Sequence, residues 1–293
     1  MRAFVIGNVA LDEAVTVAEP PAFGASIHAE AGAIDLGGKG ANQAIVLGRA
    51  GLSCRFCAAV GEDTRADDIR LRLAAEPVEA ELVRVAGVAS DFSIILRTRS
   101  GDNAVITTNA AASGMTAEAA CAALVGAVAG DLLVLQGNLS AATTGAALRR
   151  ARAMGMQTAL NPSPLRAFFA DLWPLVDIAF VNETEASALG GTAALLAAGV
   201  PQVILTLGPK GARLVTATAD VHVPAQPCAV VDTTGAGDCF MATALASAAL
   251  RGVALDARAL RHATAAAAIT VSRPGTGAAF PTRAEMADIL RQP

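Results

Sequence analysis

The stretch AVVDTTGAGDCF, residues 229–240, decides the fold that the sequence predicts. Residues 229–231 form a short apolar run typical of a buried strand, and the Ala-rich residues near 240–251 are typical of a helix. Glycines at such a joint let backbone N–H groups approach a ligand closely, and the N-terminus of the helix adds about half a positive charge. We therefore expect an anion-binding turn between a strand and a helix.

Asp238 is the acidic residue of this turn, in the first turn of the expected helix. On its own, such a residue is most simply explained as an N-terminal cap, because Asp and Ser often occupy these positions. The rest of the sequence has to decide between this explanation and a catalytic role.

The chain outside this stretch alternates between apolar runs and Ala-rich helical stretches. Each run is apolar on both faces, as expected for strands buried between two layers of helices. The alternation predicts an α/β fold of one principal domain, with a mostly parallel central sheet flanked by helices. The expected strands are 3–6, 132–135, 178–181 and 203–207, and the expected helices lie near 40–50, 117–129, 142–154 and 240–251.

Two segments break this alternation and predict a small β-sheet lid. Residues 92–98 and 103–108 are β-prone and are joined by RSGD at 99–102, which is a hairpin signal, and residues 13–36 show no helical periodicity. The apolar residues of 92–97 point to a homodimer interface through the lid or to a surface that closes over a substrate. The expected large domain comprises 1–12, 37–90 and 110–293, and the lid comprises 13–36 and 91–109.

Composition and charge exclude several classes of function. The 293 residues carry a net charge of −4 with scattered Lys and Arg, which gives no electrostatic footprint for nucleic acid. No stretch reaches the about 18 to 20 consecutive apolar residues of a membrane span. The N-terminus reads as a first strand without an export signal, and the five cysteines are irregularly spaced. We therefore expect a soluble, cytoplasmic protein with reduced thiols.

Three motifs together resemble those of the ribokinase/PfkB family. DTTGAGD at 232–238 is similar to the family's Asp-Thr-x-Gly-Ala-Gly-Asp, and GGKGANQA at 37–44 is similar to its Gly-Gly-x-Gly-Ala-Asn element, which contacts sugar. NETE at 182–185 lies between them, in the family's order. The resemblance extends from Val5 to about Pro281 and implies a ribokinase-like three-layer fold and an ATP-dependent sugar kinase.

The resemblance implies roles for the residues around Asp238. Asp238 is the expected catalytic base, which accepts the proton of a substrate hydroxyl, and the N–H groups of Gly235, Ala236 and Gly237 stabilise charge on the transferred phosphoryl group. Asn182 and Glu185 match the family's Asn-x-x-Glu, which holds Mg2+ through water. The alternative for this pair is an exposed helix start capped by Asn182.

Further residues match the family's nucleotide and cation sites. TLGPKG at 206–211 is similar to the family's Thr-Leu-Gly-x-x-Gly along the nucleotide, and 264–277 resembles the wall beside adenine. The implied nucleotide-binding residues are Asn182, Thr206, Gly208, Lys210, Gly211 and Thr264. The resemblance also implies a K+ site at Asp232, completed by main-chain carbonyls near Thr234, Thr270, Arg273 and Gly275, although Ala279 replaces a serine that contributes to this site in ribokinase.

The expected sugar site departs from that of ribokinase. Its matching residues are Asp12, Gly38, Lys39, Asn42 and Asn138, with Asp12 where the family's aspartate holds sugar hydroxyls. Ala10 stands where ribokinase has an asparagine, and Asn138 where it has a glutamate. A site that pairs particular hydroxyls discriminates strongly, so these two changes argue against assuming ribose.

The sequence therefore favours an ATP-dependent kinase that phosphorylates a hydroxymethyl group of a pentose, hexose or related polyol, with ATP, Mg2+ and K+ as the implied cofactors. Two alternatives stay open. One is a nucleoside kinase of the same fold, for which Phe23 and Phe92 are the only lid aromatics able to stack on a base. The other is a catalytically silent sugar or nucleotide sensor, against which the intact Asp238 and its glycine loop count.

Overall fold

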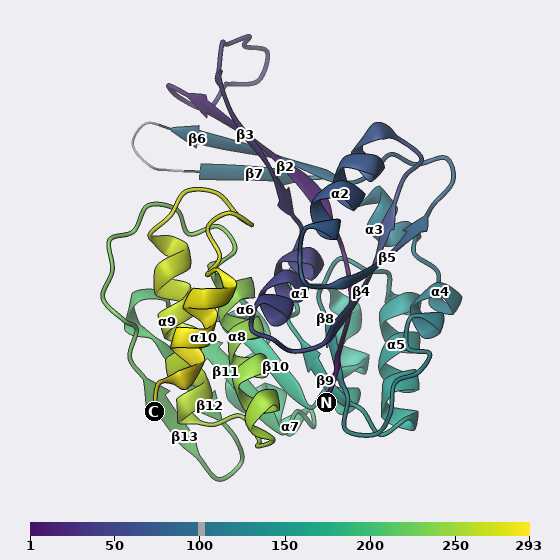
Figure 1. Ribbon diagram of the computed structural model, residues 1–293, viewed down its shortest axis with the longest axis vertical. Helices are drawn as coiled ribbons and strands as arrows, with labels where there is room; N and C mark the ends of the chain where they lie inside the picture. Colours follow the sequence, from purple (N-terminus) through teal and green to yellow (C-terminus); the bar gives the residue numbers. More distant parts are fainter. Residues whose placement is uncertain (99–102) are drawn as a thin grey trace.

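The computed structural model describes residues 1–98 and 103–293 and contains a large, mostly parallel sheet (Figure 1). Its strands pair in the order β13-β12-β11-β10-β9-β8-β1-β4-β5; all pairs from β5 to β11 are parallel, and β12 and β13 join antiparallel at one edge. The expected mostly parallel sheet is confirmed. The strands are β1 (Ala3–Gly7), β4 (Cys54–Val60), β5 (Glu79–Arg84), β8 (Leu132–Leu135), β9 (Gln157–Leu160), β10 (Ile178–Asn182), β11 (Gln202–Thr206), β12 (Ala212–Val215) and β13 (Asp220–Val223).

Helices cover both faces of this sheet because the side chains of each strand alternate between two cores. In β1, Ala3 and Val5 belong to one buried cluster, whereas Phe4 and Ile6 belong to the other. The first face is covered by α1 (Lys39–Arg49), α2 (Thr64–Ala74), α8 (Ala236–Arg251), α9 (Ala257–Val271) and α10 (Arg283–Arg291). The second is covered by α3 (Ala110–Gly114), α4 (Ala117–Ala122), α5 (Ala141–Ala153), α6 (Glu183–Ala188) and α7 (Thr192–Ala197), with 3-10 turns at Ala167–Asp171 and Trp173–Leu175.

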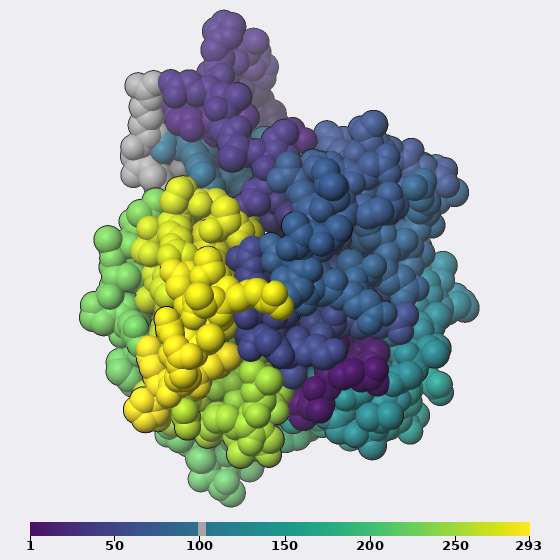
Figure 2. Space-filling model, viewed as in Figure 1, coloured from purple at the N-terminus to yellow at the C-terminus, as the bar shows by residue number. Residues whose placement is uncertain are grey.

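A second, smaller sheet projects from the body (Figures 1 and 2). It consists of β2 (Ala10–Val17), β3 (Glu30–Gly37), β6 (Phe92–Thr98) and β7 (Asn103–Thr107), in the order β3-β2-β6-β7. β6 and β7 pair antiparallel, as the hairpin signal predicts, while β2 and β6 pair parallel. The expected turn at 99–102 lies outside the described residues.

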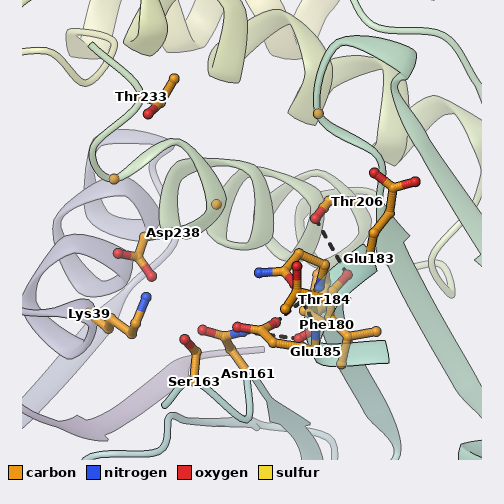
Figure 3. Close-up of a pocket in the computed structure, with 15 residues that line it drawn as sticks. Lys39, Asn161, Ser163, Phe180, Glu183, Thr184, Glu185, Thr206, Thr233 and Asp238 are labelled. Carbon is orange, nitrogen blue, oxygen red and sulfur yellow. Dashed lines mark hydrogen bonds between the residues drawn. The ribbon is translucent and has the colours of Figure 1, made fainter. Parts of the chain in front are cut away.

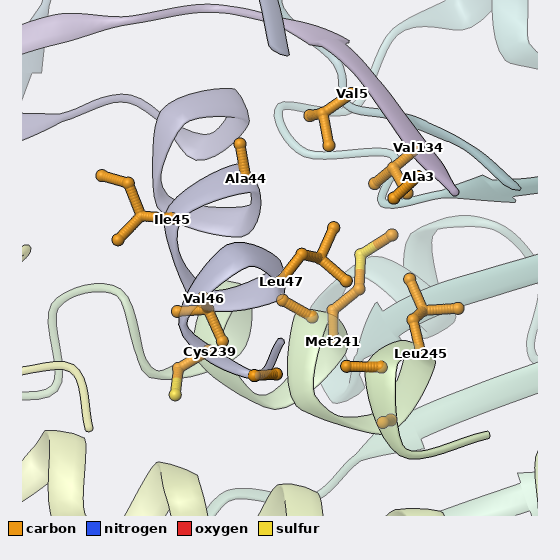
Figure 4. Close-up of a cluster of buried hydrophobic side chains, with 14 of the residues drawn as sticks. Ala3, Val5, Ala44, Ile45, Val46, Leu47, Val134, Cys239, Met241 and Leu245 are labelled. Carbon is orange, nitrogen blue, oxygen red and sulfur yellow. The ribbon is translucent and has the colours of Figure 1, made fainter. Parts of the chain in front are cut away.

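Helices α1 and α8 meet at the centre of the first core (Figure 4). Ala44 of α1 is fully buried in this core, and Leu47 of α1 with Met241 and Leu245 of α8 fill the space toward the sheet. Hydrogen bonds from Asn42 and Gln43 of α1 to Asp238 of α8 join the N-terminal ends of the two helices.

Two expected elements differ in the structure. Residues 229–231, expected to form a strand, are irregular and exposed. The last strand before them, β13, ends at Val223. Pro224 and Pro227 lack a backbone N–H donor, so they stop the hydrogen-bond ladder from continuing. The helix expected near 117–129 ends at Ala122, and the chain then turns through Gly126, whose φ of 83° favours glycine.

No helix within residues 1–98 and 103–293 is long and apolar enough to cross a membrane. The five cysteines are free thiols. Cys54 and Cys57 are buried on β4, where burial raises the pKa of each to about 12.

Asp256 joins α9 to α8 by capping one helix and pairing with the other. Its Oδ1 accepts a hydrogen bond from the Ala259 N–H at 2.8 Å, and its two oxygens accept from the Arg251 guanidinium at 2.7 and 2.8 Å. The hydrogen bonds from Arg251 lower the pKa of Asp256 to about 2.

We expect Asp256→Ala to lower the free energy of unfolding by about 1–2 kcal/mol at neutral pH, the usual cost of a lost helix cap. Because the folded-state pKa of Asp256 lies below the unfolded value, the carboxylate stabilises the fold above about pH 4, and this stabilisation is lost as the pH falls toward 2. Urea unfolding at neutral and acidic pH measures the difference. Asp256→Asn, which keeps the cap acceptor, is the control, and a wild-type-to-Ala difference that does not shrink in acid contradicts the assignment.

Candidate active site

The carboxylate of Asp238 lies at the junction of α1 and α8. Gly235 is the N-cap of α8, with a φ of 75°, and Asp238 follows in the first turn, 5% exposed. Its Oδ2 accepts a hydrogen bond from Asn42 Nδ2 and its Oδ1 one from Gln43 Nε2, each at 2.9 Å. The carboxylate is thus held by side chains of another helix, which an ordinary N-terminal cap does not require.

Gln43 is a residue of this site to which the sequence motif assigned no role. It is fully buried, and its Oε1 accepts from Gln136 Nε2 at 2.7 Å, just beyond the end of β8. A chain of side-chain amides therefore runs from Gln136 through Gln43 to Asp238. Its only signal in the sequence is that Gln43 follows Asn42 directly in the motif.

Glycines at the start of α1 let this helix approach the end of β1. A Cβ on Gly40 would lie 2.7 Å from the Asn8 carbonyl oxygen, and Gly38 has a φ of 91°. Two hydrogen bonds hold the start of α1 against the end of β1. The Gly40 N–H donates to Asn8 Oδ1 at 3.3 Å, and the Ala41 N–H donates to the Asn8 carbonyl at 3.1 Å. These contacts fix the position from which Asn42 and Gln43 reach Asp238.

A polar cavity of about 420 Å³ opens in front of Asp238 (Figure 3). The side chains of Lys39 and Asp238 face one another at one end of it, and the N-terminus of α8 contributes Gly235 and Gly237. The first N–H groups of a helix lack partners within the helix, although that of Ala236 donates to the Thr233 carbonyl at 3.3 Å. The cavity therefore combines a carboxylate with a cation and a helix N-terminus, a setting suited to an anion.

A second cavity, of about 560 Å³, is mainly apolar and adjoins the first, because Thr206, Gly208 and Gly237 line both. Thr264 and Gly211 also line it, as do exposed apolar residues such as Val230. Apolar walls beside an anion site suit a flat base attached to phosphates. The expected Lys210 lies outside both linings, with its Nζ 3.8 Å from the Glu183 carboxylate at the surface.

Asn182 and Glu185 line the polar cavity and also cap α6 reciprocally. Asn182 Oδ1 accepts from the Glu185 N–H at 2.8 Å, and Glu185 Oε2 accepts from the Asn182 N–H at 3.0 Å. The capped helix start considered from the sequence is therefore present. It uses one oxygen of the Glu185 carboxylate, and oxygen ligands of this kind suit Mg2+ with its waters.

The residues expected to face the sugar are only partly joined to one another. Asp12 is buried and accepts from Thr276 Oγ1 at 3.2 Å; burial raises its pKa, and the nearby charges of Asp35 and Asp238 add to this. Asn42 contacts Asp238 directly, whereas no hydrogen bond among the described residues joins Asn138 to Asp12, Asn42 or Asp238. The Oδ1 atoms of Asn42 and Asn138 are buried without a partner in the described structure. Buried polar atoms are normally paired, so these two oxygens are acceptors that a ligand could still use, although neither side chain lines the two cavities described above.

The residues expected around a monovalent cation lie on the loop before α8 and near the end of α9. Asp232 Oδ1 accepts from the N–H and the hydroxyl of Thr234, at 3.0 and 2.7 Å, and Asp232 Oδ2 accepts from the Gly275 N–H at 3.1 Å. Although burial acts to raise the pKa of Asp232, these hydrogen bonds hold it below its usual value. The Thr270 carbonyl accepts from the Arg273 N–H at 3.2 Å, and the Arg273 side chain pairs with Glu285.

The model of the pfkB family of carbohydrate kinases matches residues 2–283. The ribokinase of Staphylococcus aureus is 28% identical, over 97% of this chain and 98% of its own, and the deoxyribokinase of Salmonella typhi is 28% identical, over 95% of each chain. The structure of Arabidopsis thaliana ribokinase complexed with ribose and ATP superimposes with a TM-score of 0.85 at 25% identity, covering 100% of this chain and 99% of its own.

The fold and the extent of these matches define an ATP-dependent carbohydrate kinase, which confirms the expected enzyme class and the ribokinase-like fold. The chain belongs to the pfkB family of carbohydrate kinases.

We expect Gln43→Met, which removes one donor to Asp238 at similar volume, to lower kcat by about 10- to 100-fold, because a hydrogen bond to a charged group contributes about 1.5–3 kcal/mol. The KM for ATP should stay unchanged, since Gln43 lies behind the carboxylate and outside both cavity linings. Steady-state kinetics measures the split, with Gln292→Met at the exposed C-terminus as control. A wild-type kcat in the Gln43 variant contradicts a positioning role.

Proposed function

We propose that this protein transfers the γ-phosphoryl group of ATP to a hydroxymethyl oxygen of a pentose, hexose or related polyol, in the cytoplasm. The observation that carries the proposal is the buried Asp238 carboxylate, fixed by Asn42 and Gln43 at the mouth of a cavity that also receives the α8 N-terminus. A general base needs this fixed position within hydrogen-bond reach of the hydroxyl that reacts.

In the proposed reaction, Asp238 accepts the hydroxyl proton as the substrate oxygen attacks the γ-phosphorus. The new P–O bond forms while the bond between the γ-phosphorus and the bridging oxygen breaks, and ADP leaves with that bond's electron pair. The N–H groups of Gly235, Ala236 and Gly237, with Lys39, stabilise the charge on the phosphoryl oxygens. The Ala236 N–H has to exchange its long contact with Thr233 for this contact.

The nucleotide is proposed to lie across the two adjoining cavities. Its phosphates face the polar cavity, near Thr206 and Gly208, and its base lies in the apolar one, near Gly211 and Thr264. Asn182 and Glu185 would hold Mg2+ through water, and the ion, when bound, neutralises phosphate charge. The Arabidopsis thaliana ribokinase was solved in complex with both ribose and ATP, which supports this pair of ligands for the fold.

The acceptor is proposed to be a sugar or polyol held by Asp12, Gly38, Asn42 and Asn138. The unpartnered Oδ1 atoms of Asn42 and Asn138 are acceptors ready for hydroxyl donors. Ala10 is fully buried and offers no polar group, so the site pairs fewer hydroxyls than a site with an asparagine there. Turnover with a panel of pentoses, deoxypentoses, hexoses and polyols identifies the acceptor.

Neither lid aromatic is placed to stack on a nucleoside base. Phe23 is completely exposed, and the guanidinium of Arg65 lies over the ring of Phe92 at 4.4 Å. These positions weigh against the nucleoside kinase hypothesis, and the fixed Asp238 weighs against a silent sensor. Neither alternative is therefore proposed.

We expect Asp238→Asn to lower kcat by about 100- to 10,000-fold, the usual contribution of a general base, while ATP binding changes little. A coupled ADP-release assay over a panel of sugars, polyols and nucleosides measures turnover, and calorimetry measures nucleotide affinity. Asp171→Asn, an exposed aspartate outside the cavities, is the control. An Asp238 variant as active as wild type, or no ATP consumption with any panel member, contradicts the proposal.

A homodimer through the small sheet is part of the proposal. Ile34, Ile94 and Ile106 lie in one register row across β3, β6 and β7, joined through Glu13 of β2. Ile34 is 50% exposed and Ile106 62% exposed, so this row presents apolar surface to solvent on the sheet that projects from the body.

We expect light scattering to give twice the chain mass of 29.3 kDa for the wild type and the single chain mass for Ile106→Lys, because a buried unpaired charge opposes association. Val128→Lys changes a similarly exposed apolar residue in the segment that precedes β8 of the large sheet, outside the small sheet, and should remain a dimer. A monomeric wild type contradicts this part of the proposal.

A further inference from the structure

Arg97 carries a positive charge from the small sheet to the loop that precedes the N-terminus of α8. Its guanidinium Nη2 lies 2.6 Å from Asp232 Oδ2, and the two residues are 135 positions apart in the chain. The Asp232 side chain is 6% exposed and that of Arg97 27%, so the pair is largely removed from water. The backbone of Arg97 is fixed in β6, where it pairs with Thr16 of β2.

This pair occupies the position at which the family resemblance implies a monovalent cation. A carboxylate offers about four lone-pair sites, two on each oxygen. Oδ1 of Asp232 accepts two hydrogen bonds from Thr234, and Oδ2 accepts one from Gly275 and one from Arg97. All four sites are taken by N–H or O–H donors, which leaves none for an ion.

The remaining expected ligands are main-chain carbonyls, which carry no net charge to replace that of the carboxylate. The carbonyl of Thr270 already accepts one hydrogen bond from the Arg273 N–H, and the buried Ala279 has no side-chain oxygen. An ion at this place would also lie beside the Arg97 guanidinium, and like charges repel in a site with little water. The residues present therefore do not fit K+.

We propose that Arg97 takes the place of the monovalent cation, so that the protein orders its anion-binding loop and transfers phosphate without K+. The guanidinium neutralises Asp232, whose hydrogen bonds to Thr234 and Gly275 hold the chain that leads into Gly235 and Gly237. Arg97 is a positioning residue, since it acts on the loop through Asp232. The proposal rests on the proposed kinase reaction.

The test compares wild type, Arg97→Met and Arg97→Lys in KCl and in choline chloride at equal ionic strength. Wild type should have the same kcat in both salts. The kcat of Arg97→Met in choline chloride should be about 10- to 100-fold below that of wild type, which corresponds to the loss of one charged hydrogen bond, and part of this kcat should return in KCl. Arg97→Lys, which keeps the charge, should stay independent of K+. Arg84→Met, an exposed arginine on β5, is the matched control.

Thermal melting of the same proteins gives a readout that does not depend on turnover. The melting temperature of wild type should be equal in the two salts, and that of Arg97→Met should be lower and rise selectively in KCl. A wild type that requires K+ for activity, or is stabilised by it, overturns the proposal while leaving the kinase reaction intact. Full K+-independent activity of Arg97→Met overturns it as well. If wild type is inactive in both salts, the kinase proposal fails, and the melting data still decide on Arg97.

Discussion

The hydrogen bonds from Asn42 and Gln43 to the carboxylate of Asp238 are the interaction on which the rest of the structure depends. A buried carboxylate is costly unless its oxygens are paired, and here both donors come from a different helix. α1 and α8 must therefore pack closely at their N-terminal ends. α1 must also lie close to the end of β1, which the absence of a Cβ at Gly40 allows, because a Cβ there would lie 2.7 Å from the Asn8 carbonyl oxygen.

The parallel sheet gathers the polar residues at one edge. Asn8, Gln136, Asn182 and Thr206 lie at or just beyond the carboxyl ends of β1, β8, β10 and β11, and open α/β sheets bind ligands at this edge. The order of the strands separates their tasks. β1 and β8 lie on the side of the carboxylate and of the expected sugar, whereas β10 and β11 line the cavities proposed for the nucleotide.

The proposed binding of phosphates by a protein of net charge −4 requires local positive charge, and the structure offers two sources of it. The N-terminus of α8 and Lys39 face the cavity directly. Arg97 pairs with Asp232 at the start of the same loop, and in the proposal it acts on the loop through this carboxylate. Because Arg97 belongs to β6, the small sheet and the anion-binding loop are parts of one electrostatic arrangement.

The sequence by itself determined the fold class, the strands at 3–6 and 178–181, the small sheet and the order of the motifs, because these depend on local periodicity and on residues close together in the chain. The strand predicted at 229–231 is absent from the structure, because the apolar segment follows prolines at the edge of the sheet, where the hydrogen-bond ladder ends. Only the tertiary structure decided that Gln136 and Gln43 support Asp238 and that Arg97 reaches Asp232. These contacts join side chains 93, 195 and 135 positions apart, and their geometry is set by how the helices and the two sheets pack, which no local pattern records.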